Sequence, residues 1–467
     1  MSFCKSSLKR AAVSLALSGS VLFCTLTPGA AMAKGTKGLA APDKPLAKNI
    51  ILMISDGCGY NQLDAASLYQ YGETGTQVYE SFPFQFGMST YSIAGEYDPA
   101  YIWSSFNNVK NAPTDSAAAA TAMSTGVKTY DAAIGVDNDR NSLMHIAEKA
   151  EELGKATGVI TTVEFSHATP AGFVAHNPSR NDYEGIANEM LKNSATDVIM
   201  GAGHPYFTDN NTPRVPSAGN FNYVGGQNTW EGLIAGDLGV ADADGDGIAD
   251  PWTVVQTRDE FVDLMTGSTP NRVVGVPQVA TTLQQARSGD QYAAPYVVDL
   301  NQNVPTLAEM TRGALNVLDN DKDGFFLMVE GGAIDWAGHA NQSGRVIEEE
   351  IDFNRSVEAV CEWVEQNSNW GETLLIVTGD HETGYLTGSG SGIVDVKPVW
   401  TDLVNNGAGN LPGMQWNSGD HTNSLIPLFA KGDAARIFKS YADQNDPVRG
   451  KYIDNTEVAK LLFEIIE

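Results

Sequence analysis

Four short runs of apolar residues constrain the fold of this chain more than any other feature of its sequence. Each run is nearly continuous, rich in Ile, Val, Leu, Phe and Met, and too short for a buried helix. Runs of this kind are typical of strands that are buried on both faces of a parallel sheet. We expect these strands at 50–54, 158–163, 325–329 and 373–377, with a fifth at 197–200.

Segments with helical periodicity alternate with these strands. Over 142–153, apolar residues recur at spacings of three and four and so lie on one face of a helix that ends before Gly154. Strands that alternate with helices predict an α/β fold, with a mostly parallel central sheet and helices on both faces. Comparable helical patterns cover 185–192, 306–318 and 345–366.

Two stretches interrupt this alternation. Residues 204–300 are rich in Gly, Asn, Asp and Pro, and we expect an insertion there with a small structure of its own. Residues 383–419 are rich in Gly, Ser and Asn, and we expect an irregular cap loop. With 467 residues, 42% of them hydrophobic, the chain is long enough for one large domain that carries both excursions.

The first 33 residues have the pattern of a signal peptide. A positively charged start is followed by an apolar run over 11–26 and by a small-residue cleavage signal at Ala31–Ala33. We therefore expect residues 1–33 to be removed and the mature chain, 34–467, to be periplasmic or secreted. No later segment is apolar for long enough to span a bilayer, so we expect no association with a membrane.

The strong negative charge excludes some partners. The formal net charge is −28, and it becomes −31 when the three cations of residues 1–33 are removed. Such a surface repels nucleic acid and anionic membranes. It also repels an anionic substrate unless the site carries concentrated positive charge, for which bound metal ions are the usual source. Two cysteines remain, Cys58 and Cys361, and we expect buried thiols there rather than a disulfide.

Ligand-type side chains stand at the ends of the four predicted strands. Carboxyl ends of parallel strands meet at one edge of a sheet, where sites form in α/β folds. Imidazole with carboxylate is a zinc-type ligand set, and Asp335 and His339 would share one face of a helical turn. The candidates are Asp56, then Glu164, His167 and Thr169, then Glu330, Asp335 and His339, then Asp380 and His381, with a second Asp-His pair at Asp420-His421.

A serine stands at the start of an alanine-rich helical segment, Pro113–Ala122. The first N–H groups of a helix lack internal partners and the dipole is positive there, so a phosphate binds well at such a position. Ser116 is therefore a candidate nucleophile, although a helix simply capped by Thr114 or Asp115 explains the same residues. Arg180, shortly after the second strand, is the candidate phosphate clamp, because a guanidinium holds two phosphate oxygens at once.

Two acidic motifs suggest calcium. Residues 319–324 fit the EF-hand pattern, but an EF-hand needs flanking helices and 325–329 is predicted to be a strand, so this interpretation is rejected. A second loop alternates carboxylates with small residues in a glycine-rich setting, and either a calcium site or a solvated acidic turn accounts for it. Its carboxylates are Asp242, Asp244, Asp246 and Asp250.

Six blocks of the sequence resemble the bacterial alkaline phosphatase family, in the order in which that family has them. Each block alone is weakly specific, and together they span most of the chain. The blocks are 54–57, 114–118, 168–171 leading to Arg180, 329–331 leading through Asp335 to His339, 378–381, and 421–422.

The resemblance implies a broad phosphomonoesterase that releases inorganic phosphate through a phosphoserine at Ser116. It implies two zinc ions and one magnesium ion, with Asp115 orienting Arg180 on the phosphate, and it is compatible with a homodimer. The implied ligands are Asp335, His339 and His421 for the first zinc, Asp56, Asp380 and His381 with Ser116 for the second, and Asp56, Thr169 and Glu330 for the magnesium.

Two positions depart from the best-known bacterial pattern. His167 stands where many members have an aspartate near the magnesium, and Trp336 stands where they have a lysine that reaches the phosphate through water. The resemblance thus implies easier loss of magnesium and weaker inhibition by phosphate. Two alternatives remain open at this point: a phosphodiesterase or sulfatase with the same type of metal centre, and a calcium-loaded extracellular binding protein.

Overall fold

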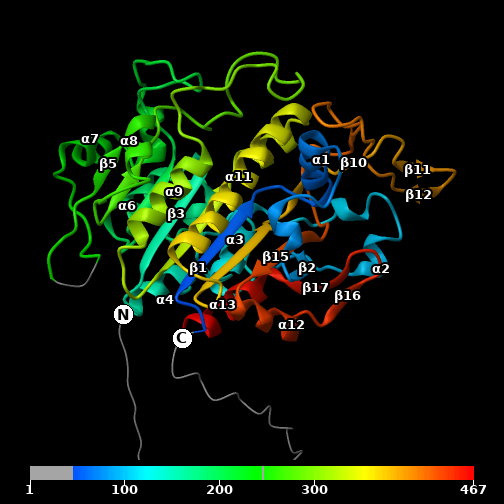
Figure 1. The fold of residues 1–467 in the computed structure, drawn as a ribbon, viewed down its shortest axis with the longest axis horizontal. Coiled ribbons are helices and arrows are strands. Elements are labelled where there is room, and N and C mark those ends of the chain that lie inside the picture. Colours follow the sequence, from blue (N-terminus) through cyan, green and yellow to red (C-terminus); the bar gives the residue numbers. More distant parts are fainter. Residues whose placement is uncertain (1–45, 244–246) are drawn as a thin grey trace, which may run out of the picture. The chain divides into compact units, whose positions relative to one another are not determined.

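A central sheet of eleven strands organises the protein. The computed structural model describes residues 46–243 and 247–467, and within them the sheet order is β16-β17-β2-β15-β8-β1-β7-β3-β4-β6-β5 (Figure 1). The run from β8 to β5 is parallel, whereas β15 is antiparallel to both of its neighbours and β16 is antiparallel to β17. The expected mostly parallel α/β fold is confirmed. The strands are β1 (Asn49–Ser55), β2 (Phe84–Ser89), β3 (Ala156–Glu164), β4 (Val198–Ala202), β5 (Thr253–Val255), β6 (Val273–Gly275), β7 (Phe325–Gly331), β8 (Thr373–Gly379), β15 (Ile426–Lys431), β16 (Gln444–Asp446) and β17 (Gly450–Asp454).

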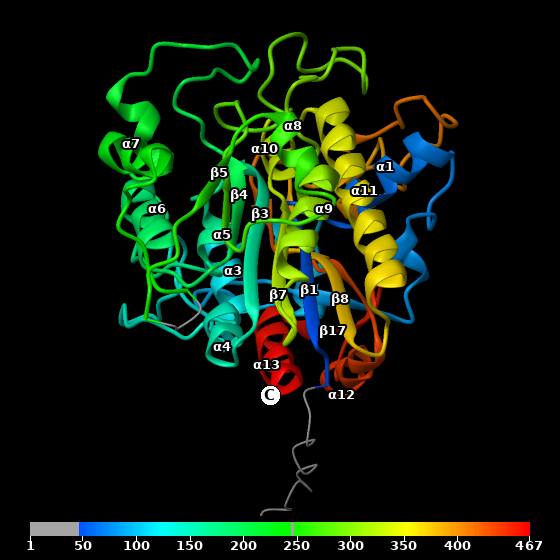
Figure 2. The ribbon, with the colours of Figure 1, turned by 60° about the vertical axis from the view of Figure 1, so that its left-hand side comes forward.

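Helices cover both faces of this sheet. Figure 2 shows α9 and α11 side by side, and a hydrogen bond between Thr311 and Ser356 joins them. The α-helices of the described residues are α1 (Tyr60–Tyr71), α2 (Pro99–Ile102), α3 (Ser116–Thr125), α4 (Ile146–Glu152), α5 (Ala168–Ala171), α6 (Tyr183–Lys192), α7 (Gln227–Ala235), α8 (Arg258–Asp263), α9 (Leu307–Leu318), α10 (Ala333–His339), α11 (Ser343–Asn367), α12 (Phe438–Tyr441) and α13 (Asn455–Ile466).

The alternation of side chains along β1 builds two separate cores. Ile50, Leu52 and Ile54 pack on one face with apolar residues of α3, α4, α6 and α13. Ile51 and Met53 pack on the other face with residues of α9 and α11. Because every residue of β1, β7 and β8 is buried, these strands read as continuous apolar runs in the sequence.

The predicted helix over 142–153 begins later than expected. Helix α4 starts at Ile146, with His145 as its N-cap residue. The preceding residues are extended instead, because the Leu143 N–H donates to the Gly135 carbonyl and Ser142 pairs with Val136. The other three predicted helices correspond to α6, α9 and α11.

The two irregular stretches contain short elements of their own. Within 204–300 lie α7 and α8, and β5 and β6 extend the edge of the main sheet. The 383–419 stretch contributes to three two-stranded sheets: β9 (Glu382–Thr383) with β14 (His421–Thr422), β10 (Leu386–Thr387) with β13 (Gln415–Trp416), and β11 (Gly392–Val394) with β12 (Lys397–Val399).

Further expectations concern the cysteines, the segments outside the described residues and the membrane. Cys58 and Cys361 are both buried and free, as expected. The predicted signal peptide, 1–33, and Asp244 and Asp246 of the acidic loop lie outside the described residues. In the part of the chain that is described, no helix is both long and apolar enough to cross a membrane.

Candidate metal centre and nucleophile

The carboxyl ends of three adjacent strands bring the predicted ligands together. Ile54, the residue before Ser55 and Asp56, stands opposite Glu330 of β7 on one side and opposite Thr378 of β8 on the other. Asp56 therefore emerges from the sheet between Glu330 and the Asp380-His381 pair. The sheet edge that the sequence predicts is the edge at which these side chains meet.

Helix α3 presents Ser116 at its first position. The alanines after Ser116 favour a helix, which ends at Gly126 in the left-handed conformation with φ of 78°. Asp115 is the N-cap, because its Oδ1 accepts a hydrogen bond from the Ala118 N–H at 2.9 Å. Asp115 also binds Arg180 through Oδ2, so it both caps the helix and orients the arginine, whereas Thr114 does not cap the helix.

Arg180 is held beside Ser116 by two contacts. Its Nη1 donates to Asp115 Oδ2 at 3.0 Å, and its Nη2 lies 3.2 Å from Nε2 of His167. Burial and, to a smaller extent, the charge of Arg180 lower the pKa of His167 to about 3, so the imidazole stays neutral and accepts from the guanidinium. His167, expected near the magnesium, thus contacts Arg180, the candidate phosphate clamp, in this structure.

Asp335, His339 and His421 form a triangle of ligand atoms. Nε2 of His339 and Nε2 of His421 are 3.0 Å apart, and they lie 3.5 and 3.4 Å from the two carboxylate oxygens of Asp335. The Nδ1 atoms of both imidazoles face backbone carbonyls, at 2.6 Å for His339 and 2.8 Å for His421. With Nδ1–H donating there, the two Nε2 atoms face each other and a carboxylate, and this set of ligand atoms suits a bound cation.

Asp56, Asp380 and His381 form a second, fully buried group beside Ser116. Nε2 of His381 lies 3.3 Å from Asp380, 3.6 Å from Asp56 and 3.2 Å from the Ser116 hydroxyl. The two groups adjoin, because the His381 and His421 rings stack with centroids 3.6 Å apart. On the other side of His381, Nδ1 meets the hydroxyl of Thr383 rather than a carboxylate, so the arrangement is not a Ser-His-Asp triad.

Several buried oxygens of this centre have no hydrogen-bond partner among the described residues. They include both carboxylate oxygens of Asp56, one each of Asp380 and Glu330, and the hydroxyl of Thr169. A hydroxyl with carboxylate oxygens is a set of hard ligands that suits magnesium, and imidazole with carboxylate suits zinc. The residues present therefore fit the three metal ions that the family resemblance implies.

The pKa values of the buried carboxylates and of His421 are raised, which indicates that the site favours bound positive charge. Burial raises the pKa of Asp380 to about 6 and that of Glu330 to about 7, and it raises the pKa of Asp56 as well. Burial acts to lower the pKa of His421, but its hydrogen bond to Asp335 outweighs this and raises the value to about 9. Bound cations would remove the cost of ionising the carboxylates.

An open cavity of about 420 Å³ gives access to this centre. Its lining includes Ser116, Arg180, Trp336 and one residue that the sequence analysis missed, Gln285. Gln285 comes from the 204–300 stretch, and its Nε2 donates to Gln342 at 2.9 Å. An isolated glutamine in a polar loop carries no pattern that could have identified it.

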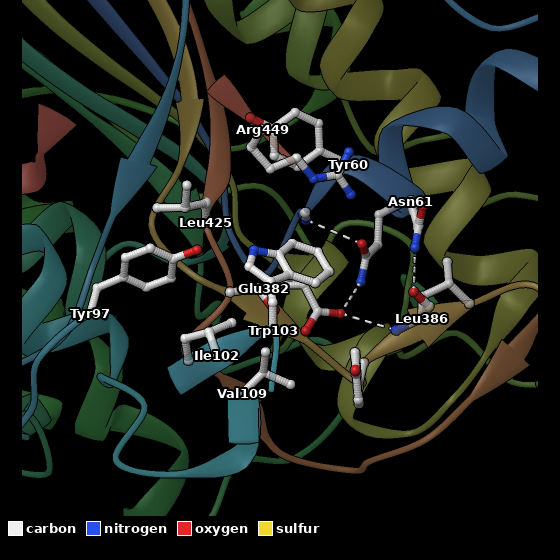
Figure 3. A pocket seen from close by; sticks show the side chains of 14 residues that line it. Tyr60, Asn61, Tyr97, Ile102, Trp103, Val109, Glu382, Leu386, Leu425 and Arg449 are labelled. Carbon is white, nitrogen blue, oxygen red and sulfur yellow. Dashed lines mark hydrogen bonds between the residues drawn. The ribbon is translucent and has the colours of Figure 1, made fainter. Parts of the chain in front are cut away.

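A second cavity, of about 60 Å³, lies beside the strand that follows His381 (Figure 3). Glu382 on its wall accepts hydrogen bonds from Gln62 at 2.7 Å and from the Leu386 N–H at 3.1 Å. Arg449 stacks on the Tyr60 ring at 3.9 Å. The two hydrogen bonds to Glu382 fix the side chain of the residue next to His381.

The fold and this centre together define a metal-dependent hydrolase. The Ser116 hydroxyl, at the start of α3, faces a group of imidazoles and carboxylates, and the Arg180 guanidinium lies close enough to bind an anionic group there. Such an arrangement combines a candidate nucleophile with candidate sites for Lewis-acid metal ions and a candidate phosphate clamp.

Comparison with known proteins identifies the family. The family model for alkaline phosphatase matches residues 47–408. The alkaline phosphatase of Escherichia coli strain K12 is 33% identical over 447 residues, covering 86% of this chain and 85% of that protein. The chain belongs to the alkaline phosphatase family, and it is an enzyme that hydrolyses phosphate monoesters.

Solved structures agree with this assignment. The alkaline phosphatase from the Antarctic bacterium TAB5 superposes with a TM-score of 0.60 and 26% identity, covering 91% of this chain and 98% of that chain. A histidine-to-aspartate variant of the TAB5 enzyme, with a TM-score of 0.60, 25% identity and coverage of 91% and 99%, has Mg bound in its M3 site.

Proposed function

We propose that Ser116 is the nucleophile of this phosphatase and forms a phosphoserine during hydrolysis of monoesters. The observation that carries the proposal is the position of its hydroxyl, at the N-terminus of α3 and 3.2 Å from His381 in the metal centre. The oxygen attacks phosphorus in line with the leaving alcohol, and water then hydrolyses the phosphoserine and releases inorganic phosphate.

Arg180 and the start of α3 would hold the phosphate during both steps. The Ser116 and Ala117 N–H groups lie in the first turn, where a helix offers them no internal acceptor. Asp115 fixes Arg180 through one carboxylate oxygen and fixes the helix start through the other. The same residue therefore sets the distance between the clamp and the nucleophile, which favours an in-line geometry.

The metal assignments rest on the two histidine groups and on the unpartnered buried oxygens. When bound, two zinc ions and one magnesium ion would supply Lewis-acid stabilisation of the serine oxygen, the leaving group and the phosphoryl charge. The proposed ligands are Asp335, His339 and His421 for one zinc, Asp56, Asp380 and His381 with Ser116 for the other, and Asp56, Thr169 and Glu330 for magnesium. Calcium at the acidic loop, through Asp242, Asp244, Asp246 and Asp250, stays a prediction.

Phosphate monoesters should be far better substrates than diesters or sulfate esters. A monoester dianion offers three terminal oxygens to Arg180 and the helix start, whereas a diester has a second ester group and less charge. We expect kcat/KM for a chromogenic monoester to exceed that of the matched diester and sulfate ester by about three orders of magnitude. A diester or sulfate ester hydrolysed as fast as the monoester would contradict the proposal and favour the phosphodiesterase or sulfatase alternative.

Trp336 is proposed to weaken retention of the product. It lies in α10 between Asp335 and His339, lines the open cavity and packs against His167, with ring centroids 5.7 Å apart. Replacing it with lysine adds a cation near the phosphate, so we expect the inhibition constant for phosphate to fall about tenfold in Trp336→Lys. Trp336→Phe, which adds no charge, is the control. An unchanged constant in Trp336→Lys would refute this role.

The cellular setting is also a proposal. We infer that residues 1–33 direct export, that the mature chain works in the periplasm or as a secreted enzyme, and that 34–467 form one domain with an insertion at 204–300 and a cap at 383–419. The signal pattern of the sequence and the acidity of the chain support this placement. A homodimer is expected from the family resemblance alone.

A further inference from the structure

Gln285 differs from the other described residues that line the open cavity, because it alone comes from the 204–300 stretch. The rest of that lining contains the candidate nucleophile, the candidate phosphate clamp and three of the proposed metal ligands. A neutral amide offers no charge to a phosphate dianion. Its hydrogen bonds suit the other part of a monoester, the leaving alcohol.

A chain of glutamine side chains holds the amide of Gln285. Its Nε2 donates to Oε1 of Gln342 at 2.9 Å, and Nε2 of Gln342 donates to Oε1 of Gln291 at 2.8 Å. Gln342 is buried and is the N-cap residue of α11. Among the described residues none donates to Oε1 of Gln285, and this oxygen is accessible to solvent rather than buried. One end of a fixed amide is therefore available to a ligand in the cavity.

Two buried arginines fasten the backbone on both sides of Gln285. Arg345 of α11 donates to the carbonyl of Gln284 at 3.1 Å and to that of Arg287 at 3.2 Å. Arg287 donates to the same Gln284 carbonyl at 3.0 Å and pairs with Glu348 of α11 at 2.7 Å. All three charged residues are at most 6% exposed. Because these buried groups are paired and hydrogen-bonded, the turn is rigid and presents Gln285 to the cavity in advance of binding.

Gln285 is attached to the His339 end of the centre, whereas the nucleophile lies at the other end. Nε2 of His381 lies 3.2 Å from the Ser116 hydroxyl, the His381 and His421 rings stack at 3.6 Å, and His421 in turn meets His339 at 3.0 Å. The glutamine that caps α11 and holds Gln285 follows His339 by three residues. An in-line displacement puts the leaving oxygen opposite the attacking one. The leaving alcohol therefore lies on the side of the cavity at which Gln285 stands.

We propose that Gln285 binds a hydroxyl group of the leaving alcohol, so that the enzyme prefers monoesters of polyhydroxylated alcohols to monoesters of plain alkyl alcohols. This inference rests on the proposed function, in which Ser116 displaces that alcohol. A hydroxyl both donates and accepts hydrogen bonds and so matches an amide. An ammonium group fits less well, because cations bound at Asp335 and His339 would repel it. Trp336, which lines the same cavity, offers an apolar surface to the carbon chain of the alcohol.

Glycerol 1-phosphate and propyl phosphate test this inference on the metal-loaded enzyme, because they share a carbon chain and differ only in hydroxyl groups. The measured quantity is the ratio of kcat/KM for the glycerol ester to kcat/KM for the propyl ester. We expect this ratio to fall about fivefold from the wild type to Gln285→Leu, which corresponds to the loss of one hydrogen bond. The intrinsic difference between the two alcohols cancels in this comparison. Gln285→Ala should give the same fall without the bulk of leucine.

Gln302→Leu is the matched control, because Gln302 is an exposed glutamine of the same stretch whose Nε2 donates to the Leu300 carbonyl at 3.1 Å. It should keep the wild-type ratio. The inhibition constant for inorganic phosphate should not change in Gln285→Leu, since phosphate has no alcohol part. A ratio that stays the same or rises in both Gln285 variants, or an equal loss on both esters, would overturn the inference. Trapping of the phosphorylated enzyme with propyl phosphate tests Ser116 separately, so a failure of the nucleophile can be told apart from a failure of Gln285.

Discussion

Ser116→Ala should lower kcat for monoester hydrolysis by about three to five orders of magnitude, because nucleophile removal has effects of this size in enzymes with covalent intermediates. The substitution removes the hydroxyl of the first residue of α3 and leaves Arg180, the helix N-terminus and the other proposed metal ligands in place. Substrate binding should therefore persist, and a slow residual hydrolysis without a phosphoserine should remain.

Ser124→Ala is the matched control for this experiment. Ser124 lies in the same helix and is equally buried, and its hydroxyl donates to the Gly172 carbonyl rather than to the metal centre. It should cost about 1 kcal/mol of stability for the lost hydrogen bond and leave turnover nearly unchanged. A Ser116→Ala enzyme with full activity would show that another group attacks phosphorus.

Removal of the metal ions should abolish activity and make the stability of the protein strongly dependent on pH. Without cations, the pKa values of Asp380, Glu330 and His421 are raised to about 6, 7 and 9 from their ordinary values. A raised pKa in the folded state means that the folded state holds its proton more tightly than the unfolded chain does. The associated stability is present at low pH and is lost as the pH rises through the folded value.

The share of stability that these three groups contribute to the metal-free protein should therefore be lost between about pH 4 and pH 9, on the order of 3 kcal/mol from Glu330 alone. The metal-loaded protein should not lose this share, since the bound ions compensate the ionised carboxylates. Melting temperatures of chelator-treated and zinc- and magnesium-reconstituted protein across this pH range provide the measurement. Burial also raises the pKa values of Glu151 and Asp197, but these groups lie away from the centre and cancel in the difference between the two forms.

Glu330→Gln is the control variant, because a neutral amide cannot contribute to the titration. Its metal-free form should show a flatter decline in stability than the metal-free wild type does. For the wild type, restoring activity to the chelator-treated protein should require both zinc and magnesium. If the difference in melting temperature between the metal-free and the metal-loaded wild type stayed constant from pH 4 to pH 9, these buried carboxylates would not contact metal ions.

The centre of the fold was predictable because its signals are local. β1, β7 and β8 are buried on both faces, so their apolar runs are recognisable in the sequence. Because the three strands are parallel, the residues that follow them lie at the same edge of the sheet, independent of the conformation of the loops. The antiparallel side of the sheet was not predicted. β2 is partly exposed, and Pro427 interrupts the apolar run of β15, so neither strand has the continuous apolar pattern of a buried parallel strand.

The residues that contact and orient the candidate site residues were the hardest to predict from the sequence. Thr383, which donates to Asp335, and Gln285, at the cavity mouth, reach the site through tertiary contacts that no spacing encodes. The two roles of Asp115 show the same limit. A cap is a local relation and can be predicted, but its bond to Arg180 joins residues 65 positions apart. The residue types at strand ends can be predicted, whereas their partners depend on the completed fold.

Acid-quench trapping of the phosphorylated enzyme tests the central claim most directly. The enzyme is mixed with labelled monoester or phosphate, quenched in acid, digested, and the labelled peptide is sequenced by mass spectrometry. A single phosphoserine at Ser116, absent in Ser116→Ala and present in Ser124→Ala, is the predicted result. Label on another residue, or a wild-type enzyme that turns over with no covalent phosphate under conditions in which dephosphorylation is slow, would contradict the account.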